Sequence, residues 1–220
     1  MRPLIDPRPV TVHPRRKWLP VAVALVAALT GYFGPWVGHG AAGLNILGVD
    51  LAEYVKFLPA YRAGQLDLLR ESFYAPLAAG SLIAGLLASR RVLPLAARWL
   101  AGAAAIPLAL AMLPPAWSPA VLLMPEFRLQ VVAIAACTGA LLLLPLTRIL
   151  PDALVLLLVA LLALVASVWP AAAFLLLPSP IGELYAATVR PGWGFWLSSI
   201  GFLLTAFTAV LGIIYRRPRR

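Results

Sequence analysis

The amino-acid sequence predicts an all-α membrane protein, a polytopic bundle of about six transmembrane helices arranged as three hairpins. Three observations predict this class: 62% of the 220 residues are hydrophobic, only 12% are charged, and the charges gather between long apolar runs. Soluble domains are about 45–50% apolar and about 25% charged. A soluble fold of this chain would expose large apolar patches, which monomers rarely do. The expected solvent of the apolar runs is therefore lipid.

Six apolar runs are expected to cross the bilayer, and with their loops they use up the chain. Each span needs roughly 20 apolar residues at about 1.5 Å per residue, and tilt or local thinning accommodates shorter ones. Helices are expected because lipid offers no partners to backbone polar groups, and the alternation typical of barrel strands is absent. The expected spans are residues 18–33, 74–88, 94–113, 127–146, 151–169 and 193–215.

The charges predict how these spans are oriented. With both termini on one side, that side holds 13 basic residues and the other holds five. Cytoplasmic loops carry the excess of Lys and Arg, so both termini are expected in the cytoplasm. The domain organisation is then a basic tail (residues 1–17), a transmembrane domain (18–215) whose first outer loop is 34–73, and a second basic tail (216–220). Arg greatly outnumbers Lys, a bias typical of GC-rich bacteria, and the expected location is the cell (plasma) membrane, the inner membrane of a bacterium.

A cleaved signal peptide is the alternative interpretation of the first run. Residues 15–17 are basic and precede an apolar stretch, as in a signal peptide. No convincing small-residue cleavage site follows them. Instead, Tyr32, Phe33 and Trp36 form an aromatic cluster that is typical of a membrane interface. We therefore expect the first run to be a transmembrane helix.

A weak repeat marks three of the spans. A basic residue, one variable residue, Leu and Pro occur in that order at residues 17–20, 91–94 and 148–151. Proline suits the first turn of a helix, where its missing N–H costs no hydrogen bond. Duplicated hairpins, as found in transporters, would explain the repeat. The abundance of Pro, Leu, Trp and Arg at helix ends is the favoured explanation, and duplication stays open.

Searches for motifs that carry chemistry find none. The sequence has no Gly-rich phosphate loop, no His-Glu-x-x-His and no paired cysteines, so no nucleotide, metal or cofactor site is expected. Cys137 is expected to be a small buried hydrophobe, and His13 and His39 have no second metal ligand nearby. Every ionisable residue lies in a loop or at the end of a span, which argues against a proton pump or haem protein built from this chain alone. The basic residues lie between apolar runs, an arrangement that argues against nucleic-acid binding.

The first outer loop contains the candidate functional residues. Asp50 and Glu53 have the spacing of a capping box, which predicts a helix from residue 50. The apolar face of this helix is expected to carry Leu51, Tyr54, Val55 and Leu58. A second amphipathic helix is expected from residue 65 to residue 73, and both are expected to lie at the outer interface. The candidate contacts to a partner or substrate are His39, Asp50, Glu53, Tyr54 and Lys56. The interpretation that the sequence favours over such a site is that this loop is a structural cap with its charges in water.

Three functions are compatible with the sequence, and the first two require no catalysis. The first is a permease-like or accessory membrane subunit of a transport system, with protein partner subunits and the lipid bilayer as its expected contacts. The second is a structural subunit of a larger membrane complex, for example one for electron transfer. The third is an interfacial enzyme that acts on lipid through His39 and the acidic residues of the outer loop, since two acids three positions apart share a helix face. We expect the first, and the protein is not expected to be an enzyme.

Overall fold

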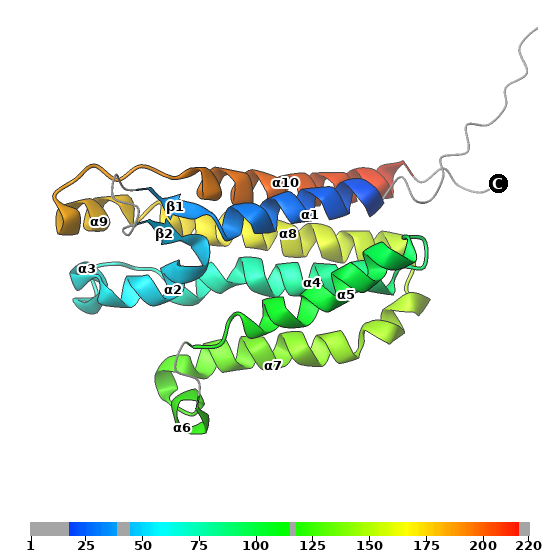
Figure 1. Ribbon diagram of the computed structural model, residues 1–220, viewed down its shortest axis with the longest axis horizontal. Coiled ribbons are helices and arrows are strands. Elements are labelled where there is room, and N and C mark those ends of the chain that lie inside the picture. The colour runs from blue at the N-terminus through cyan, green and yellow to red at the C-terminus, as the bar shows by residue number, and fades with distance from the viewer. Residues whose placement is uncertain (1–17, 39–44, 115–117, 216–220) are drawn as a thin grey trace, which may run out of the picture.

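The computed structural model describes residues 18–38, 45–114 and 118–215, and it is 77% helical. Its long helices run along one common axis (Figure 1). We call the end that carries α2, α3 and α9 the loop end, and the end where α1 begins and α10 finishes the tail end. In the described residues the long helices are α1 (Trp18–Tyr32), α4 (Ala75–Ser89), α5 (Leu95–Leu110), α7 (Arg128–Leu142), α8 (Asp152–Phe174) and α10 (Trp193–Ile214).

Four helical segments in the described part of the chain are long and apolar enough to cross a membrane. They are Arg70–Ser89, Pro125–Leu142, Asp152–Phe174 and Trp193–Ile214. Helices Trp18–Tyr32 and Leu95–Leu110 are apolar but shorter. The structure thus agrees with the prediction of a helical membrane protein.

Two helices end at residues other than those expected, and proline is involved in both differences. Helix α8 runs past Trp169 to Phe174, with Pro170 inside its last turns. Helix α7 stops at Leu142, and a 3-10 helix, η7 (Leu144–Ile149), follows with Pro145 in its first turn. Proline is tolerated in a first turn but interrupts a continuing α-helix, because it has no N–H to donate. The expected span 127–146 is therefore divided between α7 and η7.

Short elements close the loop end. Strands β1 (Pro35–Val37) and β2 (Ile46–Leu47) pair antiparallel, a hairpin that the sequence analysis did not predict. The chain then continues through five short helices to α4. They are η3 (Gly48–Asp50), α2 (Leu51–Tyr54), η4 (Val55–Phe57), α3 (Pro59–Arg62) and η5 (Arg70–Tyr74). The remaining short helices are α6 (Pro119–Leu122), η6 (Pro125–Phe127) and α9 (Pro178–Tyr185).

The first loop packs onto the bundle, and the two amphipathic helices expected at the interface are not formed as predicted. Leu51, Val55 and Leu58 do share one face, but that face is fully buried in the protein core. Residues 65–69 form no helix, and the Leu69 side chain is exposed. The loop is therefore anchored by burial of apolar side chains, which is the main favourable term in packing.

An aromatic cluster forms the core beneath this loop. Trp36 makes edge-to-face contacts with Phe73, Phe174 and Phe195, at ring-centroid distances of 6.4, 5.4 and 5.3 Å. Trp36 and Tyr32 are almost completely buried. The expectation that these two residues form an interface belt is therefore wrong, because their rings find aromatic partners inside the protein. Edge-to-face contacts of this kind stabilise cores beyond the area that they bury.

Helices α1 and α10 approach each other closely because small residues line their contact. A Cβ atom at Gly201 would lie 2.6 Å from the backbone of Ala28, and one at Gly31 would lie 2.3 Å from the Ser198 nitrogen. Gly, Ala and Ser at such contacts let two membrane helices pack backbone against backbone. Ser198 and Thr205, which lie on the same face of α10 as Gly201, are also buried.

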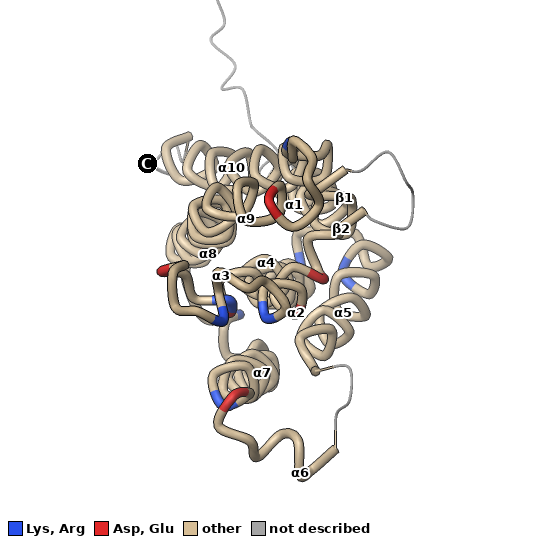
Figure 2. Tube along the Cα trace, turned by 90° about the vertical axis from the view of Figure 1, so that its left-hand side faces the viewer, with Lys and Arg blue, Asp and Glu red and all other residues tan. Residues whose placement is uncertain are grey.

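Helix α4 lies at the centre of the bundle and α7 lies on its flank (Figure 2). In the most apolar window of the segment that contains α4, 83% of the residues are buried, against 17% in the segment that contains α7. Gln130 and Cys137 are the buried residues within α7. The burial of Cys137 agrees with its predicted role as a small hydrophobe in the core. The α7 segment thus exposes most of its surface to the surroundings of the bundle.

Candidate functional site: a charge cluster at the loop end

A buried arginine organises the loop end. Arg70 is 3% exposed, at the start of η5 and directly before α4. Its guanidinium makes ion pairs with Glu53 (Nη1–Oε1, 3.4 Å) and Glu71 (Nε–Oε1, 3.2 Å). It also donates a hydrogen bond from Nη2 to the Glu126 backbone carbonyl, at 2.6 Å. A buried charge is tolerated only when it is paired and hydrogen-bonded in this way, because its desolvation is otherwise too costly.

A more exposed layer of charge covers Arg70. Lys56 Nζ lies 2.6 Å from Glu53 Oε2 and 3.0 Å from Glu126 Oε1. The Lys56 ammonium and the Arg70 guanidinium also lie over the Phe127 ring, 4.9 and 5.5 Å from its centroid. Lys56 therefore connects the first loop to η6, which precedes α7. We call Glu53, Lys56, Arg70, Glu71 and Glu126 the loop-end charge cluster.

A chain of hydrogen bonds leads from this cluster into the bundle. Tyr74 donates its hydroxyl hydrogen to Glu53 Oε1 at 3.0 Å, and Gln130 Nε2 donates to the Tyr74 hydroxyl at 3.1 Å. Gln130 Nε2 also donates to the Met112 carbonyl. Because a backbone carbonyl only accepts, this bond fixes which side of the Gln130 amide carries nitrogen. Gln130 is buried, and its Oε1 has no partner among the described residues.

The five candidate residues from the sequence do not form one site. Glu53 and Lys56 belong to the loop-end charge cluster. Tyr54 points elsewhere and donates a hydrogen bond to the Tyr185 hydroxyl of α9 at 3.2 Å. Partial burial and this hydrogen bond raise the pKa of Tyr54. Asp50 is exposed and joins neither group, and His39 lies outside the described residues.

The predicted capping box at Asp50 and Glu53 is wrong, because the helical segment begins three residues earlier. Asp50 has helical backbone angles and makes no side-chain cap bond to α2. It is the last residue of η3, and a hydrogen bond from the Leu47 backbone N–H reaches its carboxylate. An acid at the third helical position that bonds back to the residue before the helix is the acidic half of a capping box. Glu53 is thereby free to pair with Lys56 and Arg70.

Although the Asp50 residue is exposed as a whole, partial desolvation of its carboxyl group is the main influence on its pKa. It raises the pKa of Asp50 above its usual value, and the hydrogen bond from Leu47 opposes this effect. The raised pKa means that folding favours the neutral form of Asp50 more than the unfolded chain does. Asp50 is therefore a group whose ionisation weakens the fold, whereas Glu53 pairs with Lys56 and Arg70.

Five members of this site were not predicted from the sequence. They are Arg70, Glu71, Tyr74, Glu126 and Gln130, none of which was among the candidate residues. A glutamine two residues inside an otherwise apolar span was the available signal for Gln130, because a polar side chain in lipid needs a partner. The burial of Arg70 had no local signal, since two of its three partners come from the distant positions 53 and 126.

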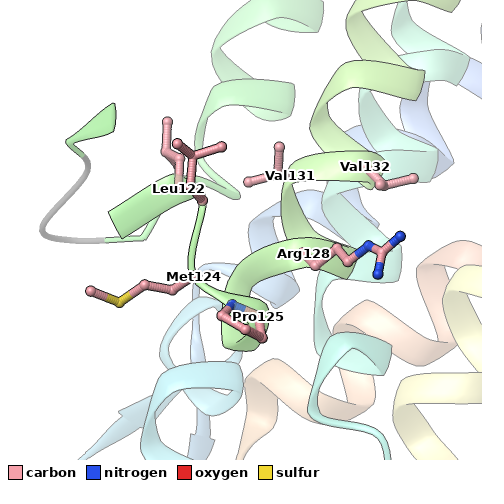
Figure 3. A pocket seen from close by; sticks show the side chains of 7 residues that line it. Leu122, Met124, Pro125, Arg128, Val131 and Val132 are labelled. Carbon is pink, nitrogen blue, oxygen red and sulfur yellow. The ribbon is translucent and has the colours of Figure 1, made fainter. Parts of the chain in front are cut away.

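A shallow pocket lies between α6 and α7, beside this site. Figure 3 shows that its lining is mainly apolar, with Leu122 and Val131 on facing elements. The guanidinium of Arg128 points away from Leu122. The described residues contain no group of three or more His, Cys, Asp or Glu that could hold a metal ion. Polar groups converge at the charge cluster and not in this pocket.

Comparison with known proteins adds no further assignment. No family model, no curated protein and no solved structure matches the chain. The function must therefore be argued from the residues and their geometry.

Proposed function

We propose that the protein crosses the bacterial plasma membrane six times, with the tail end in the cytoplasm and the loop end outside. Four segments reach the usual length of a span, and α1 and α5 have 15 and 16 residues. At about 1.5 Å per residue, helices of this length cross roughly 23 Å, which local thinning of the bilayer can accommodate. Arg90, Arg91, Arg98 and Arg148 lie at the tail end, where the described residues contain one acid, Asp152. This excess of basic charge supports the orientation.

We further propose that the protein is a non-catalytic accessory subunit of a transport system, and that the loop-end charge cluster is its contact with a partner. The observation that carries this proposal is the double layer of charge at the loop end. Arg70 is buried and fixed by three partners, and this holds the half-exposed Glu53 and Lys56 and the more exposed Glu126 in defined positions. Charges held on a rigid scaffold recognise partners by electrostatic complementarity. Figure 2, which looks onto the loop end, shows both signs of charge near α2, α3 and α7.

A structural subunit of a larger membrane complex is the second candidate, and the exposure of the α7 segment favours it. Val132, Leu142 and Leu143 are 57%, 82% and 59% exposed on this flank. Another subunit could cover this surface as well as lipid does. The third candidate, an enzyme acting on lipid, gains no support, because Asp50 and Glu53 serve separate structural roles.

The experiment that separates these functions is purification of the full chain in mild detergent, followed by mass spectrometry of what accompanies it. An accessory transport subunit retains a transporter or an ATP-binding protein. A structural subunit retains redox or other assembly components. The matched variants are Lys56→Gln and Arg190→Gln, which remove one positive charge each at the loop end, inside and outside the cluster. Loss of the transport partner in Lys56→Gln alone supports the proposal, and retention in both variants contradicts it.

A further inference from the structure

A second buried arginine lies at the tail end, and its charge is already paired within the protein. Arg90 is 6% exposed and follows the last residue of α4. Its Nη2 donates to the backbone carbonyl of Thr147 and to the Thr147 hydroxyl, and its Nε donates to Ser89 Oγ. Its Nη1 lies 3.7 Å from Asp152 Oδ1. Arg90 is thus held inside the protein, and Asp152 is the acid that balances it.

Three other arginines at the same end make no ion pair with an acid among the described residues. Arg98 donates its Nε hydrogen to the Ala88 carbonyl at 3.1 Å, which places it against the last turn of α4. Arg91 is the exposed neighbour of Arg90, and Arg148 is an exposed residue of η7. Burial lowers the pKa of Arg90 most, and the nearby charge of Arg148 lowers it further. None of the ion pairs in the described residues includes Arg91, Arg98 or Arg148. We call these three residues the tail-end arginines.

Close to the tail-end arginines in the chain, on α5 and η7, are large apolar side chains that are themselves exposed. Trp99, the neighbour of Arg98, is 71% exposed, and Ile149, the neighbour of Arg148, is 85% exposed. Leu95 and Leu146 are 65% and 61% exposed on α5 and η7. Tryptophan is enriched where the headgroups of a bilayer meet its hydrocarbon. The tail end of the bundle therefore carries both guanidinium groups and exposed apolar side chains.

We propose that the tail-end arginines and the apolar side chains beside them bind an anionic phospholipid of the membrane. The headgroup phosphate is held by Arg91, Arg98 and Arg148, and the acyl chains lie along the exposed side chains of α5 and η7. Guanidinium groups suit phosphate because their planar N–H groups match its oxygens. Basic surfaces between transmembrane helices recognise anionic headgroups in this way. The exposed apolar side chains favour a lipid over a soluble phosphate, which has no acyl chains to bury.

The test is native mass spectrometry of the purified full chain with phosphatidylglycerol or phosphatidylcholine. The wild-type protein is expected to retain phosphatidylglycerol preferentially, with a preference that weakens as salt is raised. Because each arginine near a headgroup contributes about a fivefold gain in affinity, the Arg91→Gln/Arg148→Gln variant should bind about 25-fold more weakly. Arg91→Lys/Arg148→Lys keeps the charge and should keep most of the preference. The matched control, Arg62→Gln/Arg190→Gln, removes two arginines from the loop end and should bind as wild type does.

Several results would overturn the proposal. Equal retention of the two lipids by the wild-type protein would remove the anionic preference, and this measurement needs no variant that must fold. If phosphatidylglycerol binding weakens as much in the control variant as in Arg91→Gln/Arg148→Gln, then net charge, and not this surface, attracts the lipid. Displacement of the bound lipid by millimolar glycerol phosphate would show that a soluble phosphate is the ligand. The proposal is independent of the partner proposed for the loop end, because the two experiments use different variants at opposite ends of the bundle.

Discussion

Arg70 and Arg90 flank the two ends of the central helix α4, and each donates a hydrogen bond to a backbone carbonyl beside α7. Arg70 reaches Glu126, just before α7, and Arg90 reaches Thr147, in the 3-10 helix that follows it. Between these two points α7 buries little of its surface. The flank helix is therefore fixed to the bundle at both ends by arginines, where charged donors make stronger hydrogen bonds than neutral ones.

Removal of the Arg70 side chain should destabilise the fold strongly. Arg70→Met leaves Glu53 and Glu71 without their buried cation and the Glu126 carbonyl without its donor. Breaking one side of a buried ion pair costs about 3–5 kcal/mol. Arg62→Met, an exposed change in the same loop, should stay within about 0.5 kcal/mol of wild type. Thermal unfolding of both variants in one detergent measures this difference, and equal melting temperatures would show that Arg70 is not structural.

Substitution of Gly201 should separate α10 from α1. The Cβ of Gly201→Val would lie 2.6 Å from the Ala28 backbone, which cannot move aside as a side chain can. Overpacking of this kind costs about 1–3 kcal/mol. Gly139→Ala is the matched control, since a Cβ there meets no atom within 4 Å, and it should be neutral or slightly stabilising. The melting temperatures decide the matter, and a stable Gly201→Val protein would mean that the two helices are not in contact.

Some of this architecture could be predicted from sequence because the cause is local. A long apolar run without charge must form a helix in lipid, which is why the spans expected at 151–169 and 193–215 correspond to helices α8 and α10. Tyr32 and Trp36 show the limit, since an aromatic residue near the end of a span can face the headgroups or the core. Whether the Trp36 ring faces the headgroups or the core depends on the positions of Phe73, Phe174 and Phe195, which belong to other elements.

The candidate site was only partly predictable for the same reason. Glu53 and Lys56 were identified as a charged pair of positions on a short loop helix, and their spacing does bring them together. Arg70 looked like any loop arginine, because nothing near it in sequence indicates that Glu126 lies beside it. Asp50 was assigned as a cap from its spacing to Glu53, although the helical segment begins at Gly48 and its N-cap is Leu47. Non-local packing decides each of these cases.

The orientation can be tested with reporter fusions. Fusions after Arg91, Arg148 and Arg220 should report the cytoplasm, because each follows a basic segment at the tail end or the C-terminal tail. Fusions at Gln65, Ser118 and Glu183 should report the outside. One loop that reports the opposite side would remove a span from the proposed set of six.

Asp50 should make stability depend on pH. Its pKa is raised in the folded protein from the usual value of 3.8, so its stabilising contribution is present below that value. The contribution is lost as pH rises through the folded pKa, because the folded state then holds an unfavourable carboxylate. Asp50→Asn should therefore melt like wild type near pH 3.5 and at a higher temperature at pH 7.

The control for this experiment is Asp67→Asn, which removes an exposed carboxylate from the same loop. It makes the same change in net charge and reports how the protein responds to that change alone. A gain in melting temperature at pH 7 that is equal in the two variants would assign the effect to net charge. A gain in Asp50→Asn at both pH values would contradict titration of Asp50 as its cause.

The exposed layer of the loop-end charge cluster should matter more for association than for folding. The side chain of Glu126 is 51% exposed, so its ion pair with Lys56 is a surface pair worth at most about 1 kcal/mol. Glu126→Gln should therefore unfold within a few degrees of wild type, and the hydrogen bond from Arg70 persists because it uses the Glu126 backbone. Charges at the rim of an interface chiefly alter the rate and salt dependence of association. Reduced retention of the co-purified partner, with an almost unchanged melting temperature, is the result expected of a contact surface. A large loss of stability with retention of the partner would instead show that the cluster only holds the loop onto the bundle.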